Sequence, residues 1–254
     1  MAEHADNGED IFVYTGGEQV VPHDVTHVIV DKSVKIIRRF AFYDRDRLVS
    51  IETHDGIEII EGGAFCGCTS LRVSMRLPGV RVVRDVAFAH TGLTDVEFGD
   101  KLETLGYGAF CHCPSLKSVK MPTVGEIGIH AFQYCPQLMD VEMPEVERIG
   151  ESAFSDCTRL RRIAIPLKEG IIDGDDVFHL CDNLSTIDVV GRIHKTISSL
   201  PMESWRNAMR EEIDLINRVL KDIPADEKTV AIQVWIVSVL ERLNRYKTEH
   251  KALV

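Results

Sequence analysis

GEIGIHAFQYCPQLMDVEMP, residues 125–144, is one copy of a unit that recurs along most of the chain. Its skeleton is an aliphatic residue, an Ala-Phe pair, a cysteine, a leucine, a valine and a final Met-Pro. The Ala-Phe pair recurs every 22 or 23 residues, and Val177-Phe178 follows as a drifted seventh copy; the six pairs stand at 41–42, 64–65, 87–88, 109–110, 131–132 and 153–154. A fixed spacing in this range predicts an array of stacked structural repeats.

The repeat also predicts how one unit folds. A single unit cannot bury its own apolar column, so neighbouring units must stack into one continuous core. Leu116 to Met121 should form a short strand that pairs in parallel with the strands of adjacent units, and Pro122 should end it because proline cannot donate to the ladder. The Ala-Phe pair suits a tight helical turn with the ring inward. We therefore expect an α/β repeat solenoid of the leucine-rich-repeat type, with short parallel strands plus helical turns.

Three units depart from the strict spacing. The third unit is one residue short after its phenylalanine, so its leucine is Leu93, and two other stretches carry an extra residue. Residues 70–78, SLRVSMRLP, carry one residue more than the pattern requires, and residues 170–178, GIIDGDDVF, carry another. An extra residue in one strand produces a local bulge that interrupts regular pairing. We expect small bulges at both places.

The complete pattern, aliphatic-x-x-Ile-x-x-x-Ala-Phe-x-x-Cys-x-x-Leu-x-x-Val-x-x-Pro, resembles the BspA-type leucine-rich repeats. The resemblance covers roughly residues 25–190. It implies a role in protein binding, and for many family members that role is as a surface adhesin. The motif is specific for the repeat class and carries little information about the partner.

Charge and cysteine usage limit the classes of function. The net charge is −11, and residues 1–191 hold 18 basic and 31 acidic residues, which argues against binding of nucleic acid. The first ten residues show no basic start followed by an apolar run, so we expect no secretory signal, and no stretch has the length of a membrane span. The seven cysteines, an odd number, mostly occupy one repeat column, which indicates reduced thiols and a cytoplasmic or otherwise intracellular protein.

The chain divides into four predicted segments. Residues 1–10 should be disordered, residues 11–30 should form an N-terminal cap, and residues 31–191 should form the solenoid. In residues 192–254 the apolar period changes to that of two amphipathic helices, which should form an antiparallel hairpin. An uncapped stack would expose an apolar cross-section, so we expect this α-helical hairpin to cap the open end of the solenoid.

Candidate reactive groups cluster near the repeat phenylalanines. Cys66-Gly-Cys68 and Cys111-His-Cys113 have a one-residue spacer, whereas structural zinc usually requires two residues and a second pair. His90 and His112 occupy the same repeat position and should be stacked neighbours roughly 5 Å apart. We find no catalytic constellation, so we expect no catalytic residues, no bound metal and no cofactor.

The outward positions of the strands are the candidate binding surface, because solenoids present a broad face of this kind. The side chains predicted to contact a partner are Glu52, Arg76, Asp95, Glu97, Lys120, Asp140, Glu142, Arg162 and Asp188. We interpret the protein as a monomeric, non-enzymatic scaffold that binds another protein through a concave strand face, without nucleic acid or membrane as partner. The alternatives are a thiol-dependent enzyme or hydrolase that uses the His and Cys turn positions, and a cell-surface adhesin.

Overall fold

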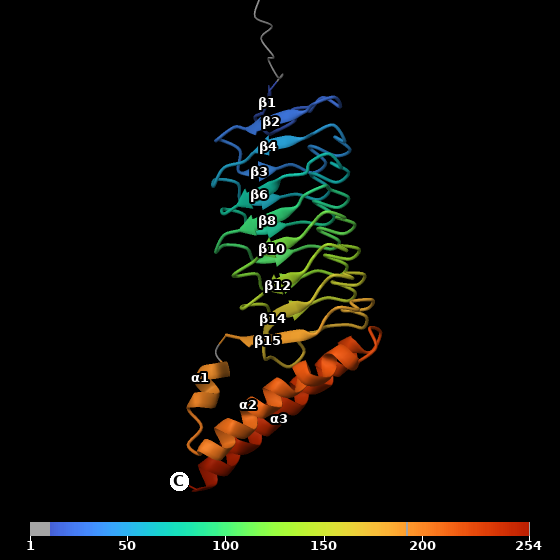
Figure 1. Ribbon diagram of the computed structural model, residues 1–254. Coiled ribbons are helices and arrows are strands. Elements are labelled where there is room, and N and C mark those ends of the chain that lie inside the picture. The colour runs from blue at the N-terminus through green and yellow to red at the C-terminus, as the bar shows by residue number, and fades with distance from the viewer. Residues whose placement is uncertain (1–10, 192, 254) are drawn as a thin grey trace, which may run out of the picture.

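Each repeat contributes one level to a stack of parallel strands (Figure 1). The computed structural model describes residues 11–191 and 193–253, so the disorder predicted for residues 1–10 lies outside the described part of the chain. One face of the stack carries β1 (Ile11–Tyr14), β2 (His27–Val30), β4 (Ser50–Glu52), β6 (Ser74–Leu77), β8 (Asp95–Phe98), β10 (Ser118–Lys120), β12 (Asp140–Glu142), β14 (Arg162–Pro166) and β15 (Thr186–Val190). The prediction of a parallel-strand solenoid is confirmed.

The register follows the alternation in the sequence. In β10, Val119 is buried in the core, and its two neighbours Ser118 and Lys120 point outward. Lys120 stands beside Glu97 of β8 and Glu142 of β12. Corresponding repeat positions therefore form rows that run along the stack.

The strand face is interrupted once. The strands on either side of the gap belong to separate sheets, β1-β2-β4 and β6 to β15. The gap coincides with the residue inserted within 70–78, where a bulge was expected, and the hydroxyl of Thr53 there donates to the carbonyl of Arg76 at 3.0 Å.

A second sheet of two-residue strands is a feature that the sequence interpretation missed. It consists of β3 (Ile36–Ile37), β5 (Ile59–Ile60), β7 (Val82–Val83), β9 (Thr104–Leu105), β11 (Glu126–Ile127) and β13 (Arg148–Ile149). The second residue of each is the aliphatic residue five positions before the repeat phenylalanine, and it is buried. Two residues are too few for a recognisable alternating pattern, which explains why only the apolar column was visible.

The segment around each Ala-Phe pair is a series of turns, which corrects the expectation of a helical turn. His130 and Tyr134, two residues before and after Phe132, have φ values of 58° and 56°. The N–H groups of His130, Phe132 and Tyr134 donate to carbonyls of the next repeat at 3.0, 2.8 and 3.0 Å. A helix directs its N–H groups to carbonyls of its own segment, whereas here every second N–H joins two repeats.

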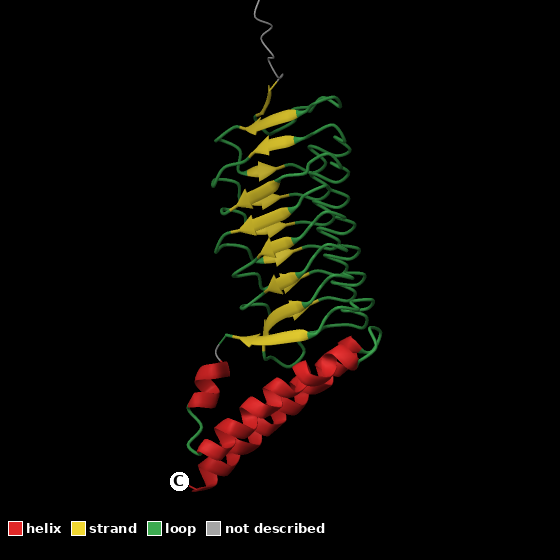
Figure 2. Cartoon of the chain, viewed as in Figure 1, coloured by secondary structure: helices red, strands yellow, loops and turns green. Residues whose placement is uncertain are grey.

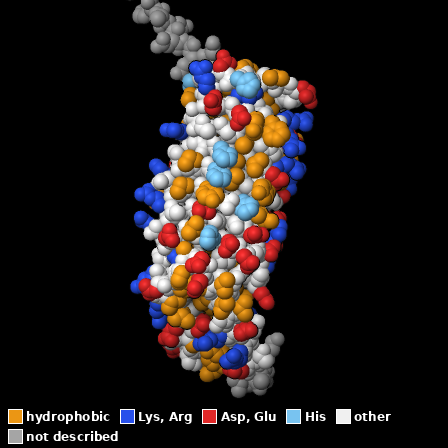
Figure 3. All heavy atoms as spheres, turned by 90° about the vertical axis from the view of Figure 1, so that its right-hand side faces the viewer, with side chains coloured by type: hydrophobic (Ala, Val, Ile, Leu, Met, Phe, Trp, Pro, Cys, Tyr) orange, Lys and Arg blue, Asp and Glu red, His pale blue; other side chains and the backbone are white. Residues whose placement is uncertain are grey.

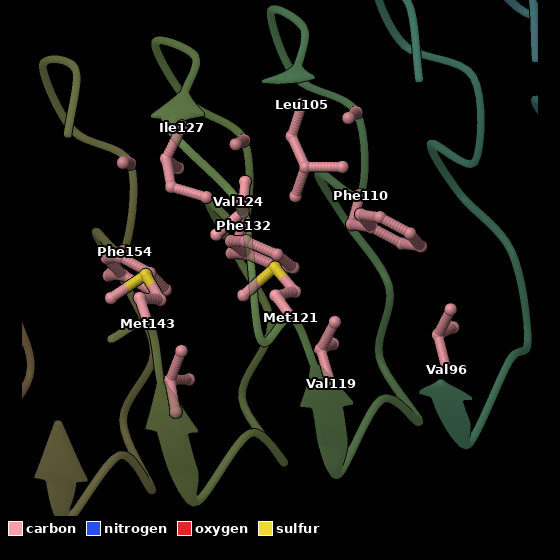
Figure 4. Packing of buried hydrophobic residues seen from close by; sticks show 14 of the residues in the cluster. Val96, Leu105, Phe110, Val119, Met121, Val124, Ile127, Phe132, Met143 and Phe154 are labelled. Carbon is pink, nitrogen blue, oxygen red and sulfur yellow. The ribbon is translucent and has the colours of Figure 1, made fainter. Parts of the chain in front are cut away.

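The core is a column of stacked phenylalanine rings. The rings of Phe110 and Phe154 lie 5.4 and 5.3 Å from the ring of Phe132, with nearly parallel planes (Figure 4). Val119 and Met121 pack beside this column from the strand side. The ring column continues through Phe42, Phe65, Phe88 and Phe178.

Helices follow the last strand and lie across the end of the stack (Figure 2). The short α1 (Ile193–Ser198) precedes a hairpin of α2 (Glu203–Val219) and α3 (Lys228–Leu253), with the 3-10 turn η1 (Leu220–Asp222) between them. The predicted C-terminal helical hairpin is thus present, whereas α1 was not predicted. No helix in residues 11–191 and 193–253 combines the length and apolar character needed to cross a lipid bilayer.

Side chains of the hairpin occupy the hydrogen-bonding positions of an absent next repeat. Asn217 pairs with both the N–H and the carbonyl of Ile187 on β15, at 2.7 and 3.0 Å. The hydroxyl of Thr229 accepts from the N–H of Phe178, the group that in earlier repeats donates to the next Ala-Phe turn. Lys228 is buried, and its ammonium donates to three carbonyls of the last repeat at 2.8–3.1 Å. These contacts satisfy backbone groups that the end of the stack would otherwise leave buried and unpaired.

Candidate functional site

The predicted strand-face residues lie where the sequence placed them, along the outward rows of the sheet. Within the longer sheet, one outward row alternates in charge over its first four members, from Arg76 to Glu142. Glu97 pairs with Arg76 at 3.5 Å and with Lys120 at 3.7 Å, so three successive repeats are joined through one carboxylate. At the other end, Arg162 contacts Glu142 at 3.9 Å and Asp188 at 2.5 Å. Most of these charges already have a partner within the protein, which weakens the case for each as an independent anchor.

A hollow of about 410 Å³ lies over the middle of this face. The predicted residues among those that line it are Glu97, Lys120, Asp140, Glu142 and Arg162. Apolar side chains from the strand ends, including Met121 and Pro144, complete the lining. The structure therefore brings five of the nine predicted residues to one depression, whereas Glu52, Arg76, Asp95 and Asp188 lie outside it.

Asp140 and Asp95 illustrate two different environments on the same face. The hydroxyl of Ser118 donates to Asp95 at 2.7 Å. Asp140 makes no ion pair among the described residues and lines the hollow directly. An unpaired carboxylate beside apolar side chains can accept a cationic group from a partner without breaking an internal contact.

A larger hollow, about 530 Å³, lies where the helices meet the last repeats. Its lining comes from the loops around Pro144 and Pro166 and from Leu240 and Leu243 of α3. None of the predicted strand-face residues lines it. It marks the junction between the solenoid and its cap.

The turn face, opposite the strand ends, carries exposed rings that sequence reasoning did not identify as a group. The rings of His90 and His112 lie 4.7 Å apart and stack, which confirms their predicted proximity, and Tyr134 continues the stack at 4.6 Å from His112. Tyr107 meets His130 edge to face at 5.4 Å. Figure 3 shows hydrophobic and histidine side chains gathered along this face. Alignment of the repeats by their Ala-Phe pairs was the available signal, because it places these rings in shared columns.

The electrostatics of the histidine stack disfavour charge. Partial burial and the neighbouring His90 both lower the pKa of His112, and Asp156 opposes them weakly. The part of the chain that the structure describes contains no group of three or more His, Cys, Asp or Glu side chains arranged to hold a metal ion. The lowered pKa of His112 therefore disfavours the protonated form of its imidazole.

The cysteine column forms a regular set of contacts with the phenylalanine column. The thiol of Cys135 donates to the carbonyl of Phe110, one repeat earlier, at 3.1 Å. The same contact, at 3.0–3.2 Å, is made by Cys68, Cys113, Cys157 and Cys181. These residues are thus fully buried packing groups with a satisfied S–H donor.

Thiol pKa values oppose the enzyme alternative. Burial raises the pKa of the Cys68 thiol to about 12 and that of the half-buried Cys111 thiol to about 11. A catalytic cysteine needs a substantial thiolate fraction near neutral pH, which a basic neighbour or helix N-terminus usually supplies. The ring of His112, next to Cys111 in the sequence, is stacked between His90 and Tyr134. Cys111, the thiol next to a histidine in the sequence, therefore lacks this activation.

The stacked parallel strands, the ring column and the capped end define a leucine-rich-repeat solenoid. Residues 23–123 and 81–208 match the BspA type leucine rich repeat region, in six copies. These two overlapping stretches span well over half of the sequence. The chain therefore belongs to the BspA-type leucine-rich-repeat family.

Solved structures show the same fold. A T. pallidum leucine-rich repeat protein is 25% identical, with a TM-score of 0.56 over 69% of this chain and 83% of its own. A leucine-rich repeat protein from Bacteroides ovatus ATCC 8483 is 19% identical, with a TM-score of 0.50 over 65% of this chain. The match spans 56% of the B. ovatus chain. Comparison with curated proteins gives no match.

Proposed function

We propose that the protein is a non-enzymatic scaffold that binds a partner protein across its strand face. The observation that carries this proposal is the hollow of about 410 Å³ that lies directly over the outward rows of β8 to β14. Neighbouring strands are about 4.8 Å apart, so three steps span about 14 Å. That length suits roughly four residues of an extended partner segment that crosses the strands.

The charges around the hollow define the chemistry of the segment. Asp140 offers a carboxylate without an internal ion pair, and Glu142 contacts Arg162 only at 3.9 Å. Met121 and Pro144 supply apolar contact area nearby. A segment with one basic side chain next to apolar residues would satisfy both features, since apolar contact supplies affinity and complementary charge supplies orientation.

We further propose an intracellular location. Seven free cysteines support it, because the five buried ones serve as single packing groups in separate repeats. Cell fractionation with an antibody against the native protein tests this location. Detection at the outer cell surface would contradict it.

Charge reversal on the strand face tests the binding role. The double variant Asp140→Lys, Glu142→Lys should lose a partner that wild-type protein retains in quantitative affinity capture from the source cell. Glu169→Lys is the matched control, because Glu169 is an exposed acid in a loop outside the hollow. Partners that the double variant and the control retain equally would show that the strand face is not the binding surface.

A further inference from the structure

The turn face carries bulky side chains at backbone positions that disfavour them. Tyr134 has a φ of 56°, in the left-handed region, and Val86 in a parallel column has a φ of 50°. Histidine and aspartate are enriched in this region, but a β-branched or aromatic residue there is strained. Gly67 and Gly108 occupy the same two columns with φ values of 82° and 54°. Glycine adopts this conformation without a steric penalty. The larger side chains of Tyr134 and Val86 therefore do not stabilise the local backbone.

Tyr134 is also exposed to solvent, and so are two apolar side chains on the same face. Tyr107 is 51% exposed, Tyr134 45% and Ile129 41%, and they come from two adjacent repeats. A single exposed apolar residue is ordinary, whereas a contiguous group with histidine rings beside it is typical of an interaction surface. Strain and exposure together indicate that the Tyr134 ring serves a contact outside the chain, and the exposed Tyr107 and Ile129 add apolar area on the same face.

The acids beyond the rings differ from those of the strand face. Asp156 follows Tyr134 in the same column, and Glu151, Asp175 and Asp176 lie on the turns of the last two repeats. None of these four makes an ion pair among the described residues, and the hydroxyl of Ser155 donates to Asp156 at 2.8 Å. Aromatic faces beside carboxylates without an ion pair match one side chain above others, arginine, whose planar guanidinium stacks on rings and pairs with carboxylates.

The protein already shows this contact once on the same face. The guanidinium carbon of Arg39 lies 4.8 Å from the ring centre of Phe40, a residue in the column that contains Val86 and His130. In the neighbouring column, one side of the Tyr134 ring is covered by His112, and the next residue on the other side is Asp156. Because successive levels are about 4.8 Å apart, a guanidinium on the Tyr134 ring is within reach of the Asp156 carboxylate.

We propose that the turn face formed by Tyr107, Ile129, His112, Tyr134 and Asp156 binds an arginine-bearing segment of a partner protein. The guanidinium contacts the Tyr134 ring and pairs with Asp156, and Tyr107 and Ile129 supply apolar area beside it. The lowered pKa of His112 reduces repulsion between its imidazole and the bound cation. This surface is separate from the strand face, so peptide binding here does not depend on whether the strand face binds a partner.

The test uses a defined peptide rather than a cell extract. A fluorescent twelve-residue peptide with four arginines in a Gly-Ser background is titrated into the full chain and followed by anisotropy, beside otherwise identical lysine and glutamate peptides. We expect the arginine peptide to bind severalfold more tightly than the lysine peptide, since only guanidinium stacks. The glutamate peptide should not bind, and added salt should weaken the arginine complex. Absence of arginine-peptide binding, or equal affinity for arginine and lysine, would overturn the proposal.

Matched variants locate the contact. Tyr134→Ala should weaken binding by about three- to tenfold, from loss of the cation–π contact. Tyr134→Phe keeps an aromatic ring and should retain most of the wild-type affinity. Asp156→Asn keeps the shape and tolerates the left-handed backbone while it removes the charge, so it should also weaken binding. Glu169→Gln, outside the strand-face hollow, should leave the affinity unchanged. If Asp140→Asn abolishes binding and Tyr134→Ala does not, the peptide occupies the strand face instead.

A stability measurement separates binding from a structural role. Tyr134→Gly relieves the left-handed strain and should leave the melting midpoint unchanged or raise it, while peptide binding falls. A large drop in the melting midpoint would show that the ring stabilises the fold, and the argument from strain would fail.

Discussion

Replacing Phe132 by alanine should destabilise the solenoid by about 4 kcal/mol, in the range known for fully buried aromatic residues. The Phe132 side chain is 0% exposed and has a ring on each side, at 5.4 and 5.3 Å. The cavity cannot close, because backbone hydrogen bonds hold the levels apart: the N–H of Phe110 donates to Ala131 and that of Phe132 to Ala153, at 2.7 and 2.8 Å. The estimate thus lies above the lower end of the range.

Urea denaturation followed by circular dichroism measures this loss. Phe40→Ala is the matched control, since Phe40 is a phenylalanine of the first repeat whose ring is about half exposed. It should cost less than about 1 kcal/mol, as most surface substitutions do. Phe12→Ala, at a half-buried position near the N-terminal end, should cost less than Phe132→Ala. Equal, small losses for Phe132→Ala and Phe40→Ala would refute the assigned register and with it the stacked-ring core.

Three further predictions concern the cap, the thiols and the histidine stack. Lys228→Met should lower the unfolding free energy by about 2–3 kcal/mol, because three buried carbonyls lose a charged donor. The matched surface change Lys221→Met should leave the melting midpoint unchanged, and an unchanged midpoint for Lys228→Met as well would show that the cap contributes little to stability. Cys135 should resist an alkylating reagent until the protein unfolds, and Cys111, with a pKa of about 11, should react slowly at pH 7; rapid selective labelling of Cys111, read by mass spectrometry, would revive the enzyme alternative. The pKa of His112 is lower in the folded than in the unfolded protein, so unfolded chains bind more protons below about pH 6.5. Stability should therefore fall as the pH drops from about 6.5 through the folded pKa. His112→Gln should flatten this part of a stability–pH profile, and identical profiles for variant and wild type would contradict the lowered pKa of His112.

The Ala-Phe period was sufficient to predict the stack and its register. A fixed spacing places equivalent residues above one another, so Val119, Phe132 and Cys135 could each be assigned to a buried column before any contact was known. The strand-face residues followed from simple alternation within each strand. The helical cap was predictable because its apolar period differs from that of the repeats.

The turns around Ala-Phe were assigned wrongly because local sequence did not show where their N–H groups go. His130 and Tyr134 adopt left-handed backbone so that alternate N–H groups reach the next repeat, a condition set by the neighbouring level rather than by the segment itself. The two-residue strands of the second sheet, such as Glu126–Ile127, depend on the same inter-repeat hydrogen bonds.

By itself the sequence determined the repeat, the buried columns, the strand-face positions and the presence of a C-terminal cap, because each is expressed in spacing along one chain. Only the tertiary structure decided which charges are already paired, which groups Lys228 and Asn217 satisfy, and which rings gather on the turn face. The charge pairs and the ring contacts arise between repeats that are about 22 residues apart in sequence and about 4.8 Å apart in space, and the contacts of Lys228 and Asn217 join the cap to the last repeat. Contacts over that distance depend on side-chain direction and burial, which no local pattern encodes.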